Sequence, residues 1–340
     1  GTFTGTLYFF NEILYYMCGI VAYVEHREAC PIVLKGLKRL EDRGYDSAGI
    51  ALMNGGLNVF KRKGKVSDLE EFIADKDVHG NIGMGHTRWA THGEPNDVNA
   101  HPHYSSSKNI AIIHNGIIEN YASLKQLLIE KGHTFQSETD SEVFINLIED
   151  IKQNSNCTLA EAVRLALHEV VGAYAIVVLS KDDHNQLIAA RKGSPLVVGI
   201  GEGEYFLASD ATPIIEYTND VVYVNDYELV VIKNGELEIR TKEDVVQTPY
   251  VQRLEMALES IEKGGYPHFM LKEIFEQPRS ILDSMRGRMI AENDHMMMGG
   301  IREFENKFVN AERIIIVACG TYWHAGLVAV DGTDLAGAQT

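Results

Sequence analysis

The sequence predicts an α+β fold in which two stacked, mostly antiparallel sheets lie between outer layers of helices. Short apolar segments with β-branched residues cluster in two blocks, residues 20–114 and 173–240, as buried strands do. Between the blocks, apolar residues recur at helical spacing at 121–131, 141–153 and 158–170. Short turns rich in Gly, Asp and Asn separate the strand segments, and such turns join antiparallel neighbours.

The first block opens with a predicted strand at Ile20–Val24, an apolar run with β-branched members. A helix follows, because Pro31 is tolerated in a first helical turn and apolar residues then recur at helical spacing up to residue 43. Ala48–Met53 and Leu57–Lys61 are predicted to form a hairpin, since an Asn-Gly pair lies between them.

The second block contains seven predicted strands. They are Ala173–Leu179, Gln186–Ala190, Leu196–Gly201, Tyr205–Ala208, Val221–Val224, Glu228–Lys233 and Glu236–Arg240. Beyond them, Val251–Lys263 and His268–Met285 have helical patterns. A lone buried strand at Arg313–Ala318 then runs into Cys319-Gly320-Thr321, an opening typical of an α/β domain.

Four regions are therefore expected along the chain. Residues 1–16 lack Lys and Arg and so do not resemble a secretory signal with a basic leader. An upstream extension, a cloning remnant or a misplaced start codon would each explain them. Residues 17–250 form the main domain, residues 251–312 a helical linker, and residues 313–340 the truncated start of an α/β domain.

Composition excludes several classes of partner. The net charge of −17 argues against nucleic acid and anionic membranes as partners. The densest basic run, residues 61–65, is predicted to be a solvated turn. The four cysteines form no C-x-x-C pair, which favours a reducing cytoplasm over a disulfide framework or a zinc cluster. No apolar run approaches the roughly 20 residues that a membrane span needs.

Five segments combine Gly with polar residues at predicted strand ends, turns or a helix start, where binding groups are usually displayed. They are Met17-Cys18-Gly19-Ile20, Arg43–Gly49, Gly85–Gly93, His114-Asn115-Gly116 at the end of a strand, and Ser137–Glu142. Each has an ordinary structural explanation when taken singly. The cysteine can be a buried small apolar residue, Asn-Gly a turn, and the Ser/Thr-acid segment a helix cap. The histidines show no metal-ligand spacing on a helix, so we expect no metal site.

Taken together, these segments resemble the class II, N-terminal-nucleophile glutamine amidotransferases, and within them the glucosamine-6-phosphate synthases. The phrases that carry the resemblance appear in the family's order: CGIV, RGYDSAGI, HTRWATHGEP, NAHPH, HNGIIEN, SETDSE, GAYA, ARKGSPL and ASD. The resemblance implies a four-layer αββα N-terminal-nucleophile hydrolase sandwich. It also implies a helical linker and a truncated α/β fragment of the sugar-isomerase (SIS) type.

The resemblance also implies how an unactivated amide is attacked. Cys18 would be the nucleophile, and its own α-amino group, with a pKa of about 7.7–8.0, would be the base. That amine exists only if Cys18 is the first residue of the mature chain. Asn115, through its side-chain amide, and Gly116, through its backbone N–H, would form the oxyanion hole.

Further positions match residues that hold glutamine in the family. Arg88 would bind the α-carboxylate through its bidentate guanidinium, and Asp140 would bind the α-ammonium. Trp89 resembles a residue that gates ammonia passage, with a packed aromatic as the alternative. The remaining matches are Thr91 and His92 as glutamine contacts, and Arg43 and Gly44 as residues that position the cysteine.

The expected partners follow from this assignment. L-glutamine is the substrate and no cofactor is implied. Fructose 6-phosphate would be the acceptor only in a full-length enzyme, because the isomerase half is missing from this chain. A homodimer is the candidate assembly. Two alternatives stay open: the glutaminase domain of an amidophosphoribosyltransferase, and an inactive binding or dimerising module if residues preceding Cys18 are retained.

Overall fold

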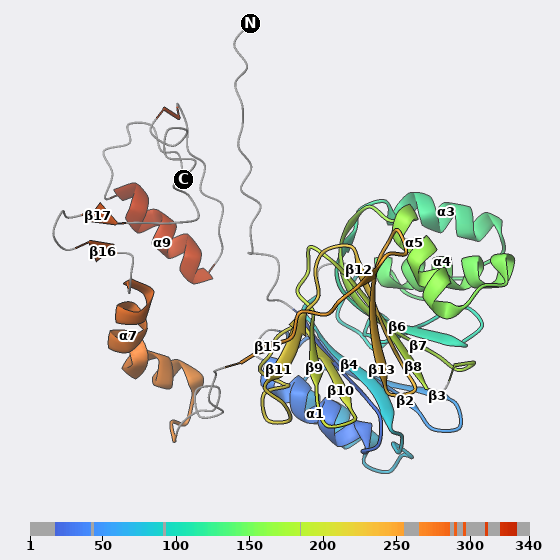
Figure 1. Ribbon diagram of the computed structural model, residues 1–340, viewed down its shortest axis with the longest axis horizontal. Helices are drawn as coiled ribbons and strands as arrows, with labels where there is room; N and C mark the ends of the chain where they lie inside the picture. The colour runs from blue at the N-terminus through green and yellow to red at the C-terminus, as the bar shows by residue number, and fades with distance from the viewer. Residues whose placement is uncertain are drawn as a thin grey trace, which may run out of the picture. The chain divides into compact units, whose positions relative to one another are not determined.

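Two large antiparallel sheets form the centre of the unit that spans residues 14–256 (Figure 1). The computed structural model describes residues 18–41, 44–90, 93–183, 185–254, 265–285, 289–290, 295–296, 310–311 and 320–331. A second unit includes residues 257–340. In the described parts of the chain, no helix combines the length and apolar character that a membrane span requires.

The first sheet has eight strands and the second has seven. In spatial order the first contains β15 (Gln252–Arg253), β11 (Asp220–Tyr223), β9 (Val197–Ile200), β10 (Tyr205–Ala208), β1 (Gly19–Val24), β4 (Ile82–Arg88), β2 (Ser47–Met53) and β3 (Leu57–Lys63). The second contains β14 (Val246–Gln247), β13 (Glu236–Thr241), β12 (Glu228–Lys233), β8 (Gln186–Lys192), β7 (Gly172–Ser180), β6 (Ile110–Ile118) and β5 (His103–Tyr104).

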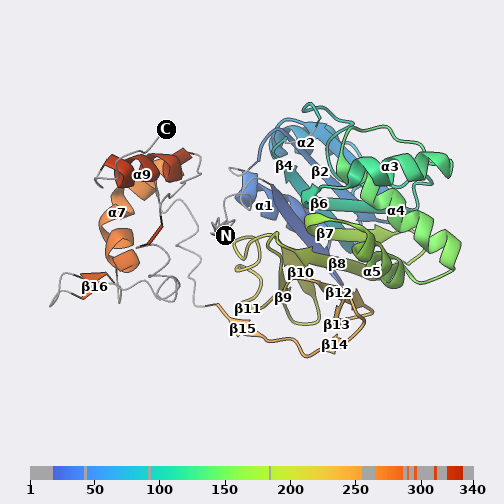
Figure 2. The same cartoon turned by 90° about the horizontal axis from the view of Figure 1, so that it is seen from above.

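Helices cover the outer face of each sheet (Figures 1 and 2). Two helices, α1 (Ala29–Leu40) and α2 (Val66–Ile73), share an apolar cluster with the first sheet. Three helices, α3 (Tyr121–Glu130), α4 (Asp140–Ser155) and α5 (Leu159–Glu169), do the same with the second sheet. A third apolar cluster contains Ile20 and Met84 of the first sheet and Ile113 and Val177 of the second, so the sheets pack face to face. The predicted αββα sandwich is confirmed.

Strand β4 is the main element that the sequence pattern did not predict. Its sequence, IGMGHTR, contains two glycines, and glycine is disfavoured in strand interiors. The structure gives the reason for them. A Cβ on Gly85 would lie 2.5 Å from Val33 Cγ1 and 2.8 Å from Leu37 Cδ1, both on α1. Glycine therefore lets α1 pack directly on β4, the strand that carries His86 and Arg88 toward the site.

Most predicted elements occur with shifted ends, and three predictions are wrong in detail. His114-Asn115-Gly116 is not the end of its strand but lies inside β6, which continues to Ile118. Residues 61–63 of the basic run belong to β3, and Lys61 Nζ donates to Val98 O at 2.9 Å and Ala100 O at 2.7 Å. A helix does not begin at residue 251, because the segment from 252 to 253 is strand β15.

In the second unit, α7 (Phe269–Met285) matches the predicted helix at 268–285. The remaining described elements are α9 (Gly320–Asp331) and the short strands β16 (Met289–Ile290) and β17 (His295–Met296). The strand predicted at residues 313–318 lies outside the described residues. The predicted boundaries of the linker and of the α/β fragment stay predictions.

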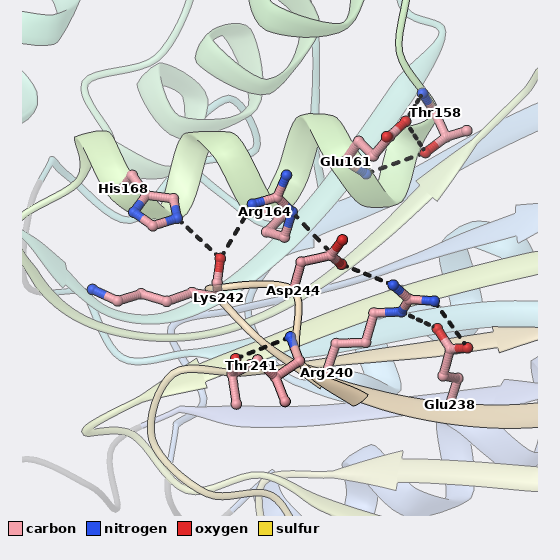
Figure 3. Close-up of polar contacts among 10 residues, drawn as sticks. Thr158, Glu161, Arg164, His168, Glu238, Arg240, Thr241, Lys242 and Asp244 are labelled. Atoms are coloured by element: carbon pink, nitrogen blue, oxygen red, sulfur yellow. Dashed lines mark hydrogen bonds and ion pairs between the residues drawn. The ribbon is translucent and has the colours of Figure 1, made fainter. Parts of the chain in front are cut away.

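Helix α5 is tied to the turn between β13 and β14 (Figure 3). Arg164 Nη1 and His168 Nε2 donate to the backbone carbonyl of Lys242 at 3.3 and 3.0 Å. The turn is held from the sheet side by Arg240, whose Nη1 donates to Asp244 Oδ1 at 2.8 Å. These contacts fix one edge of the outer helical layer to the second sheet.

Candidate active site

Cys18 immediately precedes β1 and is half-buried, and its thiol contacts the backbone of Trp89, the residue that follows β4. The Trp89 backbone N–H donates to Cys18 Sγ at 3.3 Å, and Sγ lies 3.7 Å from Trp89 O. Burial raises the pKa of the Cys18 thiol to about 11, and the Trp89 N–H and the Arg88 charge offset only part of that effect. With Cys18 in peptide linkage to residue 17, the thiol is therefore protonated at neutral pH.

Asn115 reaches Cys18 from the opposite sheet. Its Nδ2 donates to the backbone carbonyl of Cys18 at 3.1 Å, which joins β6 of the second sheet to the start of β1 in the first. Gly116 follows in the same strand and is exposed. Its φ of +130° and the position of Ala173 O, 2.1 Å from where a Cβ would lie, restrict this position to glycine.

Arg88 is buried at the end of β4, and its guanidinium Nη2 donates to Gly93 O at 3.4 Å. Burial lowers the pKa of Arg88, while the carboxylates of Asp46, Asp140 and Glu138 act to raise it. The charge of Arg88 therefore acts on the Cys18 thiol, whose pKa it lowers, and on these carboxylates. A buried guanidinium of this kind can hold a carboxylate with two parallel hydrogen bonds.

Asp140 is the first residue of α4, where the helix dipole favours a negative charge. Thr139 caps the helix by accepting from Glu142 N at 3.3 Å. Asp140 Oδ2 accepts from Ile118 N at 2.7 Å, and Ser141 Oγ lies 3.4 Å from Oδ1. The short hydrogen bond to Oδ2 orients the carboxylate. Oδ1, which has only the longer contact, is the oxygen better able to accept a further hydrogen bond.

A cavity of about 780 Å³ opens beside Trp89. Three carboxylates line it, from Asp46, Glu94 and Glu138, together with Tyr121. Asp46 Oδ2 also accepts from Ala90 N at 2.8 Å, which holds the backbone that follows Trp89. Trp89 is 38% exposed, and its indole ring meets the Tyr45 ring edge-on, with centroids 5.6 Å apart. Trp89 therefore packs on an aromatic ring and also forms part of the cavity wall.

His86, which contacts Asn115 Oδ1, is one of four buried histidines; the others are His101, His103 and His114. The rings of His86 and His101 have centroids 4.3 Å apart, and those of His101 and His103 are 4.6 Å apart. Burial lowers the pKa of His86 to about 3 and lowers the pKa values of His101, His103 and His114, so all four are neutral. Within the described ranges, no group of three or more His, Cys, Asp or Glu side chains is arranged to hold a metal ion.

Several predicted site residues thus lie together, and three others lie outside the described residues. Cys18, Arg88, Trp89, Asn115 and Asp140 are linked by the contacts and charges described above. Gly44 is buried, and its backbone N–H donates to Glu41 O at 3.0 Å. Arg43, Thr91 and His92 lie outside the described residues.

Sequence reasoning missed two residues at the site, His86 and Asp46, although both lie inside quoted motifs. Strand alternation would have found His86, since His86 and Arg88 share one face of β4 once that segment is recognised as a strand. The hydrogen bond of Asp46 to Ala90 crosses 44 residues of sequence and leaves no local pattern.

Comparison with known proteins agrees with this geometry. A family model described as glutamine amidotransferase domain matches residues 67–238. The glutamine–fructose-6-phosphate aminotransferase (isomerizing) of Bacteroides thetaiotaomicron is 59% identical over 315 residues, which are 92% of this chain and 51% of that protein. The protein of the same name from Chlorobaculum tepidum is 53% identical over 319 residues, covering 92% of this chain and 52% of its own length. The chain spans about half the length of the curated relatives it matches.

Two solved structures share the fold. The glutamine phosphoribosylpyrophosphate amidotransferase of B. subtilis, complexed with ADP and GMP, aligns with a TM-score of 0.57 and 28% identity, over 66% of this chain and 49% of that one. A structure titled the allosteric regulatory enzyme of purine biosynthesis aligns with a TM-score of 0.59 and 29% identity, over the same shares.

The two stacked sheets, with a cysteine directly before a central strand, define an N-terminal-nucleophile hydrolase fold. Within that class, the chain belongs to the glutamine amidotransferase domain family.

Proposed function

We propose that residues 17–250 hydrolyse L-glutamine to glutamate and ammonia through a thioester on Cys18. The observation that carries this proposal is the approach of Asn115 Nδ2 to the Cys18 backbone at 3.1 Å, beside a thiol held by Trp89 N–H. A nucleophile and an amide donor from two different sheets meet there. That pairing is what attack on an unactivated amide needs.

The base that removes the thiol proton cannot be one of the Trp89 backbone groups that contact the sulfur. Neither the N–H nor the carbonyl of Trp89 can accept the thiol proton, and the Cys18 pKa of about 11 keeps that proton in place at neutral pH. The α-amine of Cys18, once it is freed from peptide linkage, has a pKa of about 7.7–8.0 and suits this role.

The reaction then proceeds in two balanced steps. The α-amine takes the Sγ proton as sulfur attacks the side-chain carbonyl carbon of glutamine. Asn115 Nδ2–H and Gly116 N–H donate to the resulting oxyanion. The ammonium returns its proton to the leaving nitrogen, which departs as ammonia. Water, deprotonated by the same amine, then attacks the thioester, releasing glutamate and restoring the thiol.

Substrate charges match charges at the site. Arg88 would bind the α-carboxylate, and Asp140 Oδ1 would accept from the α-ammonium, since Oδ2 is already bonded to Ile118 N. The carboxylates that line the cavity beside Trp89 favour the same ammonium. Thr91, His92, Arg43 and Gly44 are proposed as further contacts or supports, on the motif match alone.

In a protein as long as the curated relatives, we propose that the ammonia aminates fructose 6-phosphate to give glucosamine 6-phosphate. The Bacteroides thetaiotaomicron relative, which has that acceptor in its name, matches 92% of this chain at 59% identity. The phosphoribosylpyrophosphate amidotransferase matches 66% of it at 28%, and so is the weaker candidate for the acceptor reaction.

The test compares three proteins: the 340-residue chain, a chain that begins at Cys18, and that shorter chain with Cys18→Ala. Intact mass defines the first residue of each, and a coupled glutamate dehydrogenase assay measures glutamate release. We expect hydrolysis only from the chain that begins at Cys18. Hydrolysis by the Cys18→Ala variant would refute the nucleophile. Hydrolysis by a 340-residue chain of verified mass would refute the α-amine as the base.

A further inference from the structure

The orientation of the Asn115 side chain is set by a histidine that the proposed reaction does not use. His86 Nε2 lies 2.9 Å from Asn115 Oδ1 and 3.1 Å from the backbone carbonyl oxygen of His114. The histidine is buried in β4, and the asparagine is buried in β6 of the other sheet. The contact therefore links the two sheets directly beneath the proposed oxyanion hole.

The protonation of this group follows from its neighbours. The carbonyl oxygen of His114 can only accept, so His86 Nε2 must carry a proton. The same N–H then requires an acceptor on Asn115, which must be Oδ1. At its other end Asn115 faces the carbonyl of Cys18, which again only accepts, so Nδ2 must point there. The three contacts allow one tautomer and one amide orientation.

The remaining ring nitrogen of His86 supports a neutral imidazole. Nδ1 is buried and has no hydrogen-bond partner among the residues that the structure describes. A second N–H at that position would be an unsatisfied buried donor. The charged neighbour Arg88, on the same strand face, also disfavours a cation there.

We propose that His86 is a positioning residue for the oxyanion hole: its Nε2–H holds Asn115 Oδ1, so that Nδ2 faces the nucleophile. This inference rests on the proposed glutaminase reaction. The terminal torsion of an asparagine is broad and roughly two-fold, and its two ends have nearly the same shape. Without the His86 donor, a flipped amide would present Oδ1 to the developing oxyanion and repel it. His86 would thus act on the rate of the chemical step and not on glutamine binding.

The kinetic test uses chains that begin at Cys18. His86→Leu removes the donor, and His86→Gln keeps an amide N–H at similar reach. We expect His86→Leu to lower kcat on the order of 10²-fold with KM nearly unchanged, and His86→Gln to recover activity to within about tenfold of the parent. Equal losses in the two variants, or a loss confined to KM, would overturn the proposal.

A double-mutant cycle separates positioning from a general structural role. If His86 acts through Asn115, adding His86→Leu to Asn115→Ala should cause almost no further loss of kcat. His101→Leu is the matched control, because it removes a buried imidazole whose ring lies 4.3 Å from that of His86 but whose Nε2 contacts Ser141 Oγ and not Asn115. Its effect should multiply with that of Asn115→Ala. Multiplicative effects for His86→Leu would contradict the proposal.

A readout that needs no activity keeps this inference distinct from the proposed function. In the 340-residue chain, long-range ¹H–¹⁵N spectra of labelled histidine report which ring nitrogen carries the proton. We expect His86 to be neutral and protonated at Nε2. A neutral Nδ1–H form or a cation would overturn the proposal, whether or not any chain hydrolyses glutamine. If the spectra agree but the chain that begins at Cys18 is inactive, the proposed function fails instead.

Discussion

The side-chain amide of Asn115 donates to the backbone carbonyl of Cys18 at 3.1 Å, so a residue of the second sheet is anchored at the nucleophile of the first. A donor at this place serves an oxyanion only if it is already oriented before the substrate arrives. Asn115→Ala, in a chain that begins at Cys18, should therefore lower kcat by roughly 10²–10³-fold with a much smaller change in KM. Steady-state glutamate release measures both constants, and a change confined to KM would contradict an oxyanion role.

Gly116 offers a backbone test of the same hole. Gly116→Ala should lower both kcat and the midpoint of thermal unfolding, because a Cβ would meet Ala173 O at 2.1 Å in a backbone with φ of +130°. Gly132→Ala is the matched control, since Gly132 has φ of +94° and nothing within 4 Å of a Cβ. It should lose only the strain of positive φ, on the order of 1 kcal/mol, and keep full kcat. Equal behaviour of the two variants would show that the close approach to Ala173 does not matter.

Arg88 should act on binding more than on rate. Arg88→Lys keeps the charge but loses the planar pair of donors, so KM for glutamine should rise about 10- to 100-fold while kcat changes less. Arg62→Lys is the matched control, because Arg62 forms a half-exposed pair with Asp97. Its KM should equal that of the parent. A large fall in kcat with unchanged KM for Arg88→Lys would assign Arg88 to the chemical step instead.

The pH dependence of Cys18 labelling follows from its raised pKa. Only the thiolate reacts with iodoacetamide, so a pKa of about 11 leaves Cys18 of the 340-residue chain almost unreactive at neutral pH. Its labelling rate should rise about tenfold for each pH unit up to that pKa. The chain that begins at Cys18 should label faster near neutrality, because the adjacent ammonium favours the thiolate. Cys18→Ala subtracts labelling of Cys30 and other thiols, and equal rates in the two chains would contradict the assigned role of the amine.

The packing of α1 on β4 predicts a stability effect away from the reacting groups. Gly85→Ala places a methyl group 2.5 Å from Val33 Cγ1, and such overpacking costs about 1–3 kcal/mol. Gly56→Ala lies in an open hairpin turn with nothing within 4 Å, so its free energy of unfolding should change little. Urea unfolding followed by circular dichroism compares the two, and a neutral Gly85→Ala would mean that α1 can move away at no cost.

Much of the fold was predictable because apolar periodicity is local. The strand and helix patterns of β1, α1 and α5 lie in their own residues and gave the right elements. Strand β4 was missed because it contains glycines, which are unusual inside strands. The close packing of α1 on β4 requires them. β15 was missed because two polar edge residues, Gln252 and Arg253, become a strand only by pairing with β11.

The candidate site divides in the same way. Motif resemblance supplied Cys18, Arg88 and Asn115, whose residue types carry their chemistry in any context. It did not supply His86, because its role depends on a hydrogen bond to a strand of the other sheet, 29 residues away in sequence. In sequence, a histidine in a buried strand reads as an ordinary core residue. Its role becomes visible only when the neighbouring carbonyl oxygens, which can only accept hydrogen bonds, fix its tautomer.

The most direct test of the central claim is the site of the covalent intermediate. A chain that begins at Cys18 is mixed with glutamine, quenched in acid within one turnover, and mapped by peptide mass spectrometry. We predict a glutamyl group on the peptide that contains Cys18, and no such adduct in the Cys18→Ala variant. Glutamate release with the adduct on another residue, or from the Cys18→Ala variant, would contradict the account.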